Sequence, residues 1–268
     1  MKADLHMHTN YSDGKYSPSE LLDLAINNNL DIVSITDHDT FDGVLKAITL
    51  NKDIRIILGI ELSTYHNDES VHVLGYFNSV EEVQKMNEEL QDQINKRRER
   101  AIEMLDLLEQ LFNIKLDRGF VDEVTSVTRG TIAREIIKQG YQYTNAQIFA
   151  KMLGDGCPAY IPSSKMETKY GVNLIHKYGG LAVLAHPMEL KKNNPTDLLE
   201  FGFDGIEAKY PTHLDKEEKY RGIAKDYKLF ITSGTDFHNF NDGKHGNIGQ
   251  TYLDKKDLEI FLRMLDGR

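Results

Sequence analysis

The chain has 268 residues, a net charge of −10 and one cysteine. This length suits one large α/β domain, or one domain that carries an insertion. The acidic balance argues against an extended surface for nucleic acid, which would need clustered lysine and arginine. It leaves room for a small anionic substrate, because metal ions in a pocket can reverse the local sign of the charge.

Three features of the sequence predict a cytoplasmic protein. Cys157 has no second cysteine with which it could form an internal disulfide. The opening residues, MKADLH, lack the apolar core of a signal peptide. No run of about 18 apolar residues is present, so we expect no membrane-spanning helix. The sequence does not indicate the oligomeric state.

Residues 1–78 alternate strand and helix patterns. The predicted strands are Ala3–His6, Asp31–Thr36, Ile54–Ser63 and Val71–Phe77. The predicted helices cover residues 20–29 and Thr40–Leu50. The first helix follows Ser17-Pro18-Ser19-Glu20, a capping box with proline at the first helical position. This alternation is typical of a parallel sheet.

A helical segment interrupts the alternation. Val80–Phe112 is one long helical pattern, and Asp117–Gly154 continues with short helices, so we interpret residues 79–165 as a helical insertion. The strand and helix alternation returns in residues 166–268. The elements predicted there are the strands Leu181–Ala185, Gly205–Ala208 and Leu229–Ser233, and the helices Lys169–Tyr178, Lys216–Tyr227 and Lys255–Leu265.

Histidines and carboxylates gather at the ends of the predicted strands, on about six separate segments. The residues are His6, His8, Asp37, His38, Glu61, His72, His186, Asp236 and His238. In barrel-like α/β folds, the chemistry collects at the carboxyl ends of parallel strands. We therefore expect these side chains to meet at one edge of the sheet.

The spacing of His6 and His8 has a direct geometric meaning. Alternate residues of a strand project to the same face, so both imidazoles can reach one ion while Met7 points the other way. Imidazole and carboxylate ligands suit zinc, manganese or iron, and several carboxylates among the histidines indicate more than one ion. A lone histidine is more often a hydrogen-bonded residue without a ligand role. The histidines set aside on that ground are His66, His176, His213 and His245.

Six short stretches carry a resemblance to the PHP (polymerase and histidinol phosphatase) family of metal-dependent phosphoesterases. In family order they are DLHMHT (4–9), TDHDT (36–40), GIELS (59–63), VHVLG (71–75), LAHP (184–187) and GTDFH (234–238). Nearly the whole chain is similar to the subgroup that hydrolyses nucleoside 3′,5′-bisphosphates, some members of which also trim RNA from the 5′ end. The resemblance implies an α/β fold, a distorted (β/α)7 barrel, in agreement with the predicted strands.

The resemblance also implies three divalent metal ions, Mn²⁺, Fe²⁺ or Zn²⁺. The three sets of ligands are His6, His8, Glu61 and Asp236; the bridging Glu61 with His72 and His186; and Asp13, His38 and His238. The expected mechanism is in-line attack by a metal-bridging hydroxide held by Glu61, His6, His8 and Asp236, without a covalent phospho-enzyme. The group that protonates the leaving oxygen stays open between a metal-bound water and a site histidine.

The insertion offers cations for a second phosphate. The resembling subgroup shows Arg-Pro-His followed by an apolar residue, Ala and Arg. Arg129, Ala133 and Arg134 match this pattern, whereas Gly130 and Thr131 depart from it. We predict that Arg129 and Arg134 bind substrate phosphate, because a guanidinium donates two parallel hydrogen bonds, and we add Lys165 as a third candidate. The alternative for both arginines is a solvated helix face or an ion pair with a neighbouring carboxylate.

The expected function is hydrolysis of phosphate monoesters, above all the 3′-phosphate of nucleoside 3′,5′-bisphosphates, with short 5′-phosphorylated RNA as a further substrate. The departure at Gly130-Thr131 keeps another PHP phosphatase open, acting on nucleoside monophosphates, cyclic phosphates or histidinol phosphate. Two further alternatives are a metal-binding module without turnover and a metal-dependent amidohydrolase or deaminase. All nine ligand positions carry metal-competent residues, and Asp236-x-His238 is the phosphoesterase ending, so the first interpretation is favoured.

Overall fold

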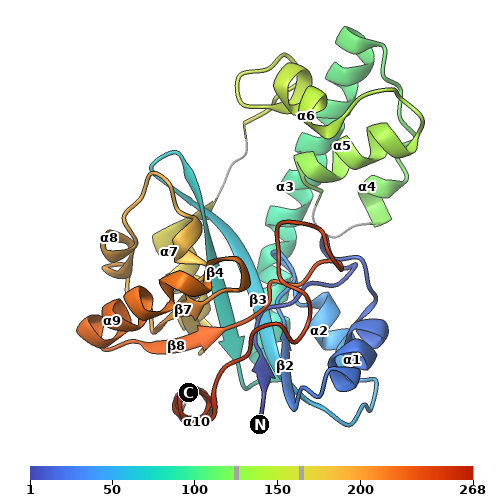
Figure 1. Ribbon diagram of the computed structural model, residues 1–268. Helices are drawn as coiled ribbons and strands as arrows, with labels where there is room; N and C mark the ends of the chain where they lie inside the picture. Colours follow the sequence, from blue (N-terminus) through green and yellow to red (C-terminus); the bar gives the residue numbers. More distant parts are fainter. Residues whose placement is uncertain (124–126, 163–165, 268) are drawn as a thin grey trace. The chain divides into compact units, whose positions relative to one another are not determined.

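The chain forms two compact units. The computed structural model describes residues 1–123, 127–162 and 166–267. The first unit contains residues 1–88 and 165–268, and the second contains residues 89–164. Figure 1 follows the chain from the blue N-terminus through the green second unit to the red C-terminus. Every residue predicted as a metal ligand belongs to the first unit.

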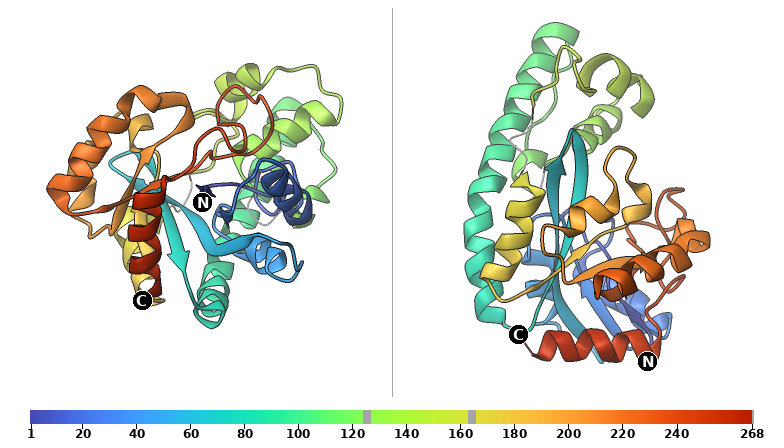
Figure 2. Two further views of the ribbon diagram at one scale, coloured as in Figure 1. Left: turned by 60° about the horizontal axis from the view of Figure 1, so that its bottom comes forward. Right: turned by 90° about the vertical axis from the view of Figure 1, so that its left-hand side faces the viewer.

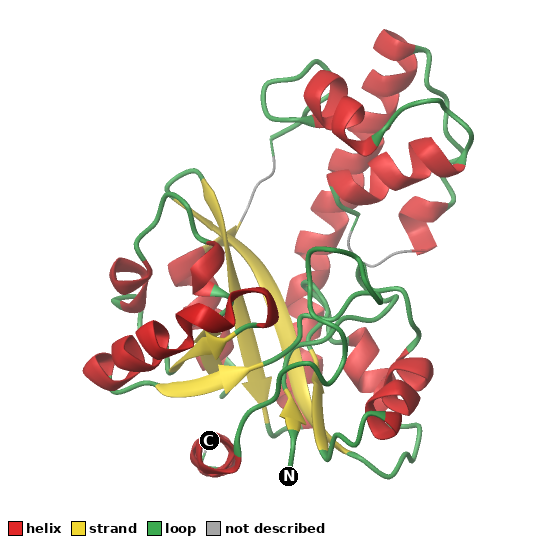
Figure 3. Cartoon of the chain, viewed as in Figure 1, coloured by secondary structure: helices red, strands yellow, loops and turns green. Residues whose placement is uncertain are grey.

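The first unit is built on one curved sheet of eight strands (Figure 3). Its strands, in sheet order, are β1 (Ala3–Asp4), β2 (Ile32–Ile35), β3 (Arg55–His66), β4 (Glu69–Phe77), β6 (Leu181–Leu184), β7 (Gly205–Lys209) and β8 (Phe230–Ser233). The eighth, β5 (Met166–Glu167), pairs with the end of β3. The sequence did not predict β5, because two residues are too few to show a period.

Strand β4 is the exception to parallel pairing. It runs antiparallel to both β3 and β6, whereas the other pairs of neighbouring strands are parallel. The turn after His66 reverses the chain, so the beginning of β4 lies beside the end of β3, with His72 opposite Ser63. This reversal explains how His72, at the start of its strand, reaches the edge where the other strands end.

The sheet closes almost fully into a barrel. Beyond β1 the chain pairs with the segment that follows β8, where Met7 forms a parallel bridge with Phe237. The Leu5 amide donates to the Ser233 carbonyl at 3.2 Å, and the His8 amide donates to the Phe237 carbonyl at 2.9 Å. The predicted α/β class and distorted barrel are therefore confirmed.

Helices surround this barrel. They are α1 (Pro18–Asn27), α2 (Asp42–Ala47), α7 (Thr168–Lys177), α8 (Pro195–Leu199), α9 (Glu217–Tyr227) and α10 (Lys255–Asp266). The predicted capping box opens α1, where the Ser17 amide donates to Glu20 Oε2 at 2.8 Å and the Glu20 amide donates to Ser17 Oγ at 3.4 Å. The five-residue α8 escaped prediction because it spans little more than one helical turn.

Helix α10 covers the end of the barrel opposite the predicted ligands. Figure 2 shows it lying across the end at which β1 begins. Its Leu258, Phe261 and Leu265 are buried against a core that includes Ala3 and Tyr76. Burying apolar surface there favours the folded barrel by roughly 25 cal/mol per Å², and it leaves the other end of the sheet for polar side chains.

The second unit is helical. Helix α3 (Val80–Phe112) begins in the first unit and ends in the second, and its bounds agree with the predicted helix. The shorter elements are α4 (Phe120–Glu123), α5 (Arg129–Lys138), α6 (Asn145–Ile148) and a π-helical turn, η1 (Phe149–Leu153). Buried residues of α3 and α5 share one apolar core. None of the described helices combines the length and hydrophobicity that a membrane span needs.

Candidate metal centre

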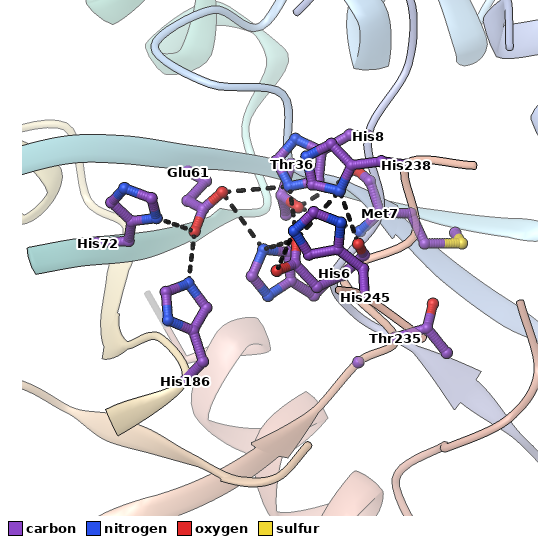
Figure 4. Close-up of polar contacts among 12 residues, drawn as sticks. His6, Met7, His8, Thr36, Glu61, His72, His186, Thr235, His238 and His245 are labelled. Atoms are coloured by element: carbon purple, nitrogen blue, oxygen red, sulfur yellow. Dashed lines mark hydrogen bonds and ion pairs between the residues drawn. The ribbon is translucent and has the colours of Figure 1, made fainter. Parts of the chain in front are cut away.

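The strand ends bring the predicted ligands of the first set together. His6 and His8 each place Nε2 against the same two carboxylates, as their spacing predicts. His6 Nε2 lies 3.4 Å from Glu61 Oε2 and 3.2 Å from Asp236 Oδ1. His8 Nε2 lies 3.1 Å from each of the same two oxygens. Figure 4 shows the two imidazoles converging while Met7 points away from them. These four donor atoms all lie within 4.8 Å of one another.

A second group lies beside the first. Asp13, His38 and His238 form it together with His8, again with donor atoms within 4.8 Å of one another. His238 Nε2 lies 3.0 Å from Asp13 Oδ1, and His38 Nε2 lies 3.9 Å from Asp13 Oδ2. The three residues predicted to share an ion thus face one another. His8 lies between this group and the first.

Glu61 connects these groups to a third. Its Oε1 lies 2.9 Å from His72 Nδ1 and 3.1 Å from His186 Nε2, so both predicted partners meet the same oxygen. The other oxygen, Oε2, lies 3.1 Å from His38 Nδ1. The close donor cluster here consists of His38, Glu61 and His72, and His186 meets the same Oε1 of Glu61 as His72.

The donor atoms of this cluster suit divalent cations. Six of them are buried yet lack a hydrogen-bond partner among the described residues: His6 Nε2, His8 Nε2, Asp13 Oδ1, His38 Nδ1, Glu61 Oε2 and Asp236 Oδ1. An unpartnered buried polar atom costs roughly 1–3 kcal/mol, and more when it is charged. Zinc–nitrogen and zinc–oxygen bonds of about 2.0–2.2 Å would separate neighbouring ligands by a little over 3 Å. The distances between these atoms match that separation.

The electrostatics of the cluster fit the same interpretation. Burial alone would raise the pKa of Glu61, but His38, His72 and His6 hold it well below its usual range. Burial lowers the pKa of His38 to about 4. An ionised carboxylate and a neutral imidazole are the forms that bind metal ions. Burial would also lower the pKa of His8, but Asp236 and Glu61 raise it to about 10, so a cation bound there would displace a proton.

A layer of buried carboxylates holds the ligand-bearing turns. Asp37, which follows β2, turns away from the cluster and accepts the Thr9 amide at 2.7 Å and the hydroxyls of Thr9 and Ser12 at 2.6 Å. Asp4 accepts the amide and hydroxyl of Thr235 at 2.9 and 2.7 Å. These contacts join segments far apart in sequence, so no spacing of residues along the chain could predict them.

A small cavity of about 70 Å³ opens beside the ligand groups. Seven predicted ligands line it, and the other lining residues are Glu189, Lys244 and His245. His245 stacks on His238 with ring centroids 4.0 Å apart, and its Nδ1 lies 2.7 Å from Asp242 Oδ2. His245, which the sequence analysis set aside as a lone histidine, thus lies beside the predicted ligands. It follows no strand, so its position in the sequence carried no signal.

Two of the three predicted phosphate contacts, Arg129 and Arg134, lie in the second unit. Arg129, the first residue of α5, donates to Asp155 Oδ1 at 2.8 Å, and its guanidinium lies 5.1 Å from the ring centroid of Tyr160. Arg134 is exposed on the same helix. Lys165 lies outside the described residues. The Thr131 hydroxyl accepts the Thr128 amide at 3.3 Å, so this residue, at a position of departure from the family pattern, helps to cap α5.

Comparison with known proteins agrees with this geometry. The family model for the PHP domain matches residues 4–153. A 5′-3′ exoribonuclease from Haemophilus influenzae is 31% identical over 88% of this chain and 90% of its own length. A 3′,5′-nucleoside bisphosphate phosphatase from Chromobacterium violaceum is 28% identical over 92% of this chain and 90% of its own length. A solved structure from Bifidobacterium adolescentis is assigned as a metal-dependent phosphoesterase. It superposes with a TM-score of 0.81 at 26% identity, and the match covers 99% of this chain and 98% of the other.

The family model covers more than half of the chain, and these relatives align over most of it. The relatives act on phosphate esters, so the predicted enzyme class, a phosphoric ester hydrolase, is confirmed. Together with the histidines and carboxylates gathered at the strand ends, the likenesses establish that the chain belongs to the PHP domain family of metal-dependent phosphoesterases.

Proposed function

We propose that this phosphoesterase removes the 3′-phosphate from nucleoside 3′,5′-bisphosphates and also acts on short 5′-phosphorylated RNA. The observation that carries the proposal is the set of six buried donors that lack a partner among the described residues and converge beside a cavity of about 70 Å³. Pockets that enclose a whole small molecule measure roughly 300–1,000 Å³. The cavity therefore suits a terminal phosphoryl group, while the rest of the substrate lies outside it.

The proposal includes three divalent ions held by the nine predicted ligands. His6, His8, Glu61 and Asp236 would hold one, and Asp13, His38 and His238 another. Glu61 with His72 and His186 would complete a third. Imidazole and carboxylate donors suit Mn²⁺, Fe²⁺ and Zn²⁺ alike, so the ligands leave a choice among these metals. We also propose that the helical insertion spans residues 79–165, between the two parts of the barrel.

When bound, such ions lower the pKa of water and neutralise charge on a phosphoryl group. The chain's own residues determine where that chemistry can occur. Glu61 offers Oε2 to one side and Oε1 to the other, so a single carboxylate spans two groups of histidines. Three carboxylates among six histidines balance only half of the charge of three dications. The loaded site would be positive and would attract an anionic phosphate.

A second phosphate on the substrate would give Arg129 its role in the proposal. Asp155 holds one edge of its guanidinium, and the ring of Tyr160 lies beside it. Holding the guanidinium in place reduces the conformational entropy lost when an anion binds. A substrate with only one phosphate would leave the part of the guanidinium that does not face Asp155 without an anion, which favours bisphosphates over monophosphates.

A second candidate function rests on Thr131. Because its hydroxyl is engaged in the cap of α5, it cannot replace a family histidine as a substrate contact without breaking that cap. A different phosphate monoester, such as a nucleoside monophosphate, would then be preferred. The two candidates share the metal chemistry and differ only in what is recognised beyond the phosphate being cleaved.

Hydrolysis by Mn²⁺-loaded protein separates the two, measured as phosphate release from the monoesters and as nucleotide release from the RNA oligomer. Adenosine 3′,5′-bisphosphate, AMP, histidinol phosphate and a 5′-phosphorylated RNA oligomer would be tested in parallel, with kcat/KM as the measure. Preference for the bisphosphate or the oligomer by about tenfold or more supports the first candidate, as one charged hydrogen bond is worth roughly 1.5–3 kcal/mol. Preference for a monophosphate rejects it in favour of the second.

A further inference from the structure

We propose that Glu207 is a positioning residue of the metal centre, one that fixes the ring of His6 and the backbone of His186 together. This inference rests on the proposed metal site but is independent of which phosphate ester is cleaved. Glu207 lies on β7 and is fully buried. No strand-end motif points to Glu207, because it lies in the middle of the five-residue strand β7.

One carboxylate makes both contacts. His6 Nδ1 lies 3.2 Å from Glu207 Oε1 and 3.3 Å from Oε2. The His186 amide donates to Oε2 at 2.9 Å. Glu207 therefore links the segment after β1 to the segment after β6, across the sheet and from the middle of β7.

The contact with His6 determines which ring nitrogen can bind a cation. A carboxylate oxygen only accepts hydrogen bonds, so Nδ1 must carry the hydrogen that faces Glu207. The other nitrogen, Nε2, then faces Glu61 and Asp236 and is the one that can offer a lone pair to a cation; it has no hydrogen-bond partner among the described residues. Metal-binding histidines commonly hold their other nitrogen in this way, and loss of the partner typically weakens metal affinity 10- to 100-fold.

The contact with His186 acts on the backbone. His186 has φ 24° and ψ 58°, in a region that residues with a side chain rarely adopt. Such a conformation persists only where surrounding contacts hold it. The hydrogen bond from its amide to Glu207 is one of these contacts, and it places the His186 ring so that Nε2 meets Glu61.

The same strand provides a matched control. Asp204, just before β7, accepts His176 Nε2 at 2.7 Å and the Ala182 amide at 2.8 Å. It is thus another carboxylate that joins one imidazole and one backbone amide, at the opposite end of β7 from the cluster. A structural effect common to such pairs would appear in both variants, whereas a positioning effect would appear only at Glu207.

The experiment compares Glu207→Gln with Asp204→Asn in the full-length protein, with Zn²⁺ alone as the probe. Each change keeps the shape of the side chain but replaces one acceptor oxygen by an amide donor. Zn²⁺ affinity is measured by chelator competition, and imidazole N–H resonances are followed by NMR of the diamagnetic Zn²⁺ form. Unfolding temperatures in the presence of chelator show how much each change disturbs the fold itself.

We expect Glu207→Gln to lower Zn²⁺ affinity by 10- to 100-fold and to remove the slowly exchanging Nδ1–H resonance of His6. Asp204→Asn should leave both unchanged and affect only the resonance of His176. Wild-type Zn²⁺ affinity in Glu207→Gln would overturn the proposal. So would an equal loss in both variants, accompanied by equal loss of thermal stability, since this would mean a general structural role.

Neither readout depends on hydrolysis. If every substrate in the panel fails while Glu207→Gln still weakens Zn²⁺ binding selectively, the proposed substrate is wrong and the positioning role stands. If wild-type protein binds no Zn²⁺ at all, the metal site and the role of Glu207 are both rejected.

Discussion

Glu61 and Asp236 each place one carboxylate oxygen 3.1 Å from the same nitrogen, Nε2 of His8. Both oxygens are buried and without hydrogen-bond partners among the described residues. Two like charges directed at one point need a positive partner. Protonated His8 supplies it in the absence of metal, since its pKa is raised to about 10, and a bound cation would take the place of that proton. This relationship makes metal content a matter of stability as well as of activity.

Removing metal should therefore lower the unfolding temperature. A ligand that binds only the folded state at 100 times its Kd contributes about 2.7 kcal/mol, which for a protein of this size corresponds to roughly 5–10 °C. Calorimetry of protein treated with chelator, then titrated with Mn²⁺ or Zn²⁺, measures this shift. An unfolding temperature that stays constant across the titration would contradict the assignment of the cluster as a metal centre.

Glu61→Gln should abolish most activity, because Glu61 faces His8 and His38 through one oxygen and His72 and His186 through the other. We expect kcat to fall by more than about 100-fold, beyond the usual effect of an outer contact. Metal content by mass spectrometry should fall in parallel. Glu259→Gln, on the exposed surface of α10, is the control and should keep both values.

Arg129→Ala should act on substrates with two phosphates. Losing one charge-assisted contact should raise KM for adenosine 3′,5′-bisphosphate by roughly tenfold or more, while hydrolysis of p-nitrophenyl phosphate stays unchanged. Arg118→Ala is matched to it, since Arg118 is in the same unit and also pairs with carboxylates, Asp106 and Glu109. Equal KM values for the bisphosphate in wild type and Arg129→Ala would remove this arginine from the proposed site.

Gly43→Ala should loosen the turn that carries His8. A Cβ at residue 43 would overlap Asp37 Oδ2 and lie 2.7 Å from Thr9 Oγ1, so it would displace the carboxylate that holds this turn. We expect a loss of about 1–3 kcal/mol in unfolding free energy, with weaker metal binding. The measurement is urea unfolding with and without Mn²⁺.

Gly222→Ala is the counterpart of that change. Gly222 lies in α9, and nothing lies within 4 Å of a Cβ built there. Alanine should therefore stabilise the helix by roughly 0.4–1 kcal/mol. If Gly43→Ala proved as harmless as Gly222→Ala, the tight packing of Asp37 against residue 43 would have no part in holding the site.

The parts of the site that the sequence predicted are those with local signals. His6 and His8 share a face because alternate residues of an extended segment do, here on either side of the bridge at Met7. Glu61 lies inside the buried strand β3, and His186 follows the buried strand β6. Barrel topology then brings such strand ends to one edge. Long, apolar or well-capped elements were predictable for the same reason, as α3 and the capping box of α1 illustrate.

The remaining parts depend on contacts between distant segments. Glu207 is 201 residues from His6, and its place in the middle of β7 looks like that of any buried strand residue. The reversal of β4 and the position of His245 are likewise set by how segments pack, which one sequence does not record. Hydrophobic periodicity reports which face of a strand is buried, but not which neighbour it meets.

The bridge between Met7 and Phe237 also has a consequence for biosynthesis. Strand β1 is synthesised long before the segment after β8, so the barrel cannot close until that segment has left the ribosome. Until then His6 and His8 lack Asp236, and the partly made chain exposes an unpaired strand edge. Metal capture at these residues is therefore a late event, one that marks a chain whose barrel has been completed.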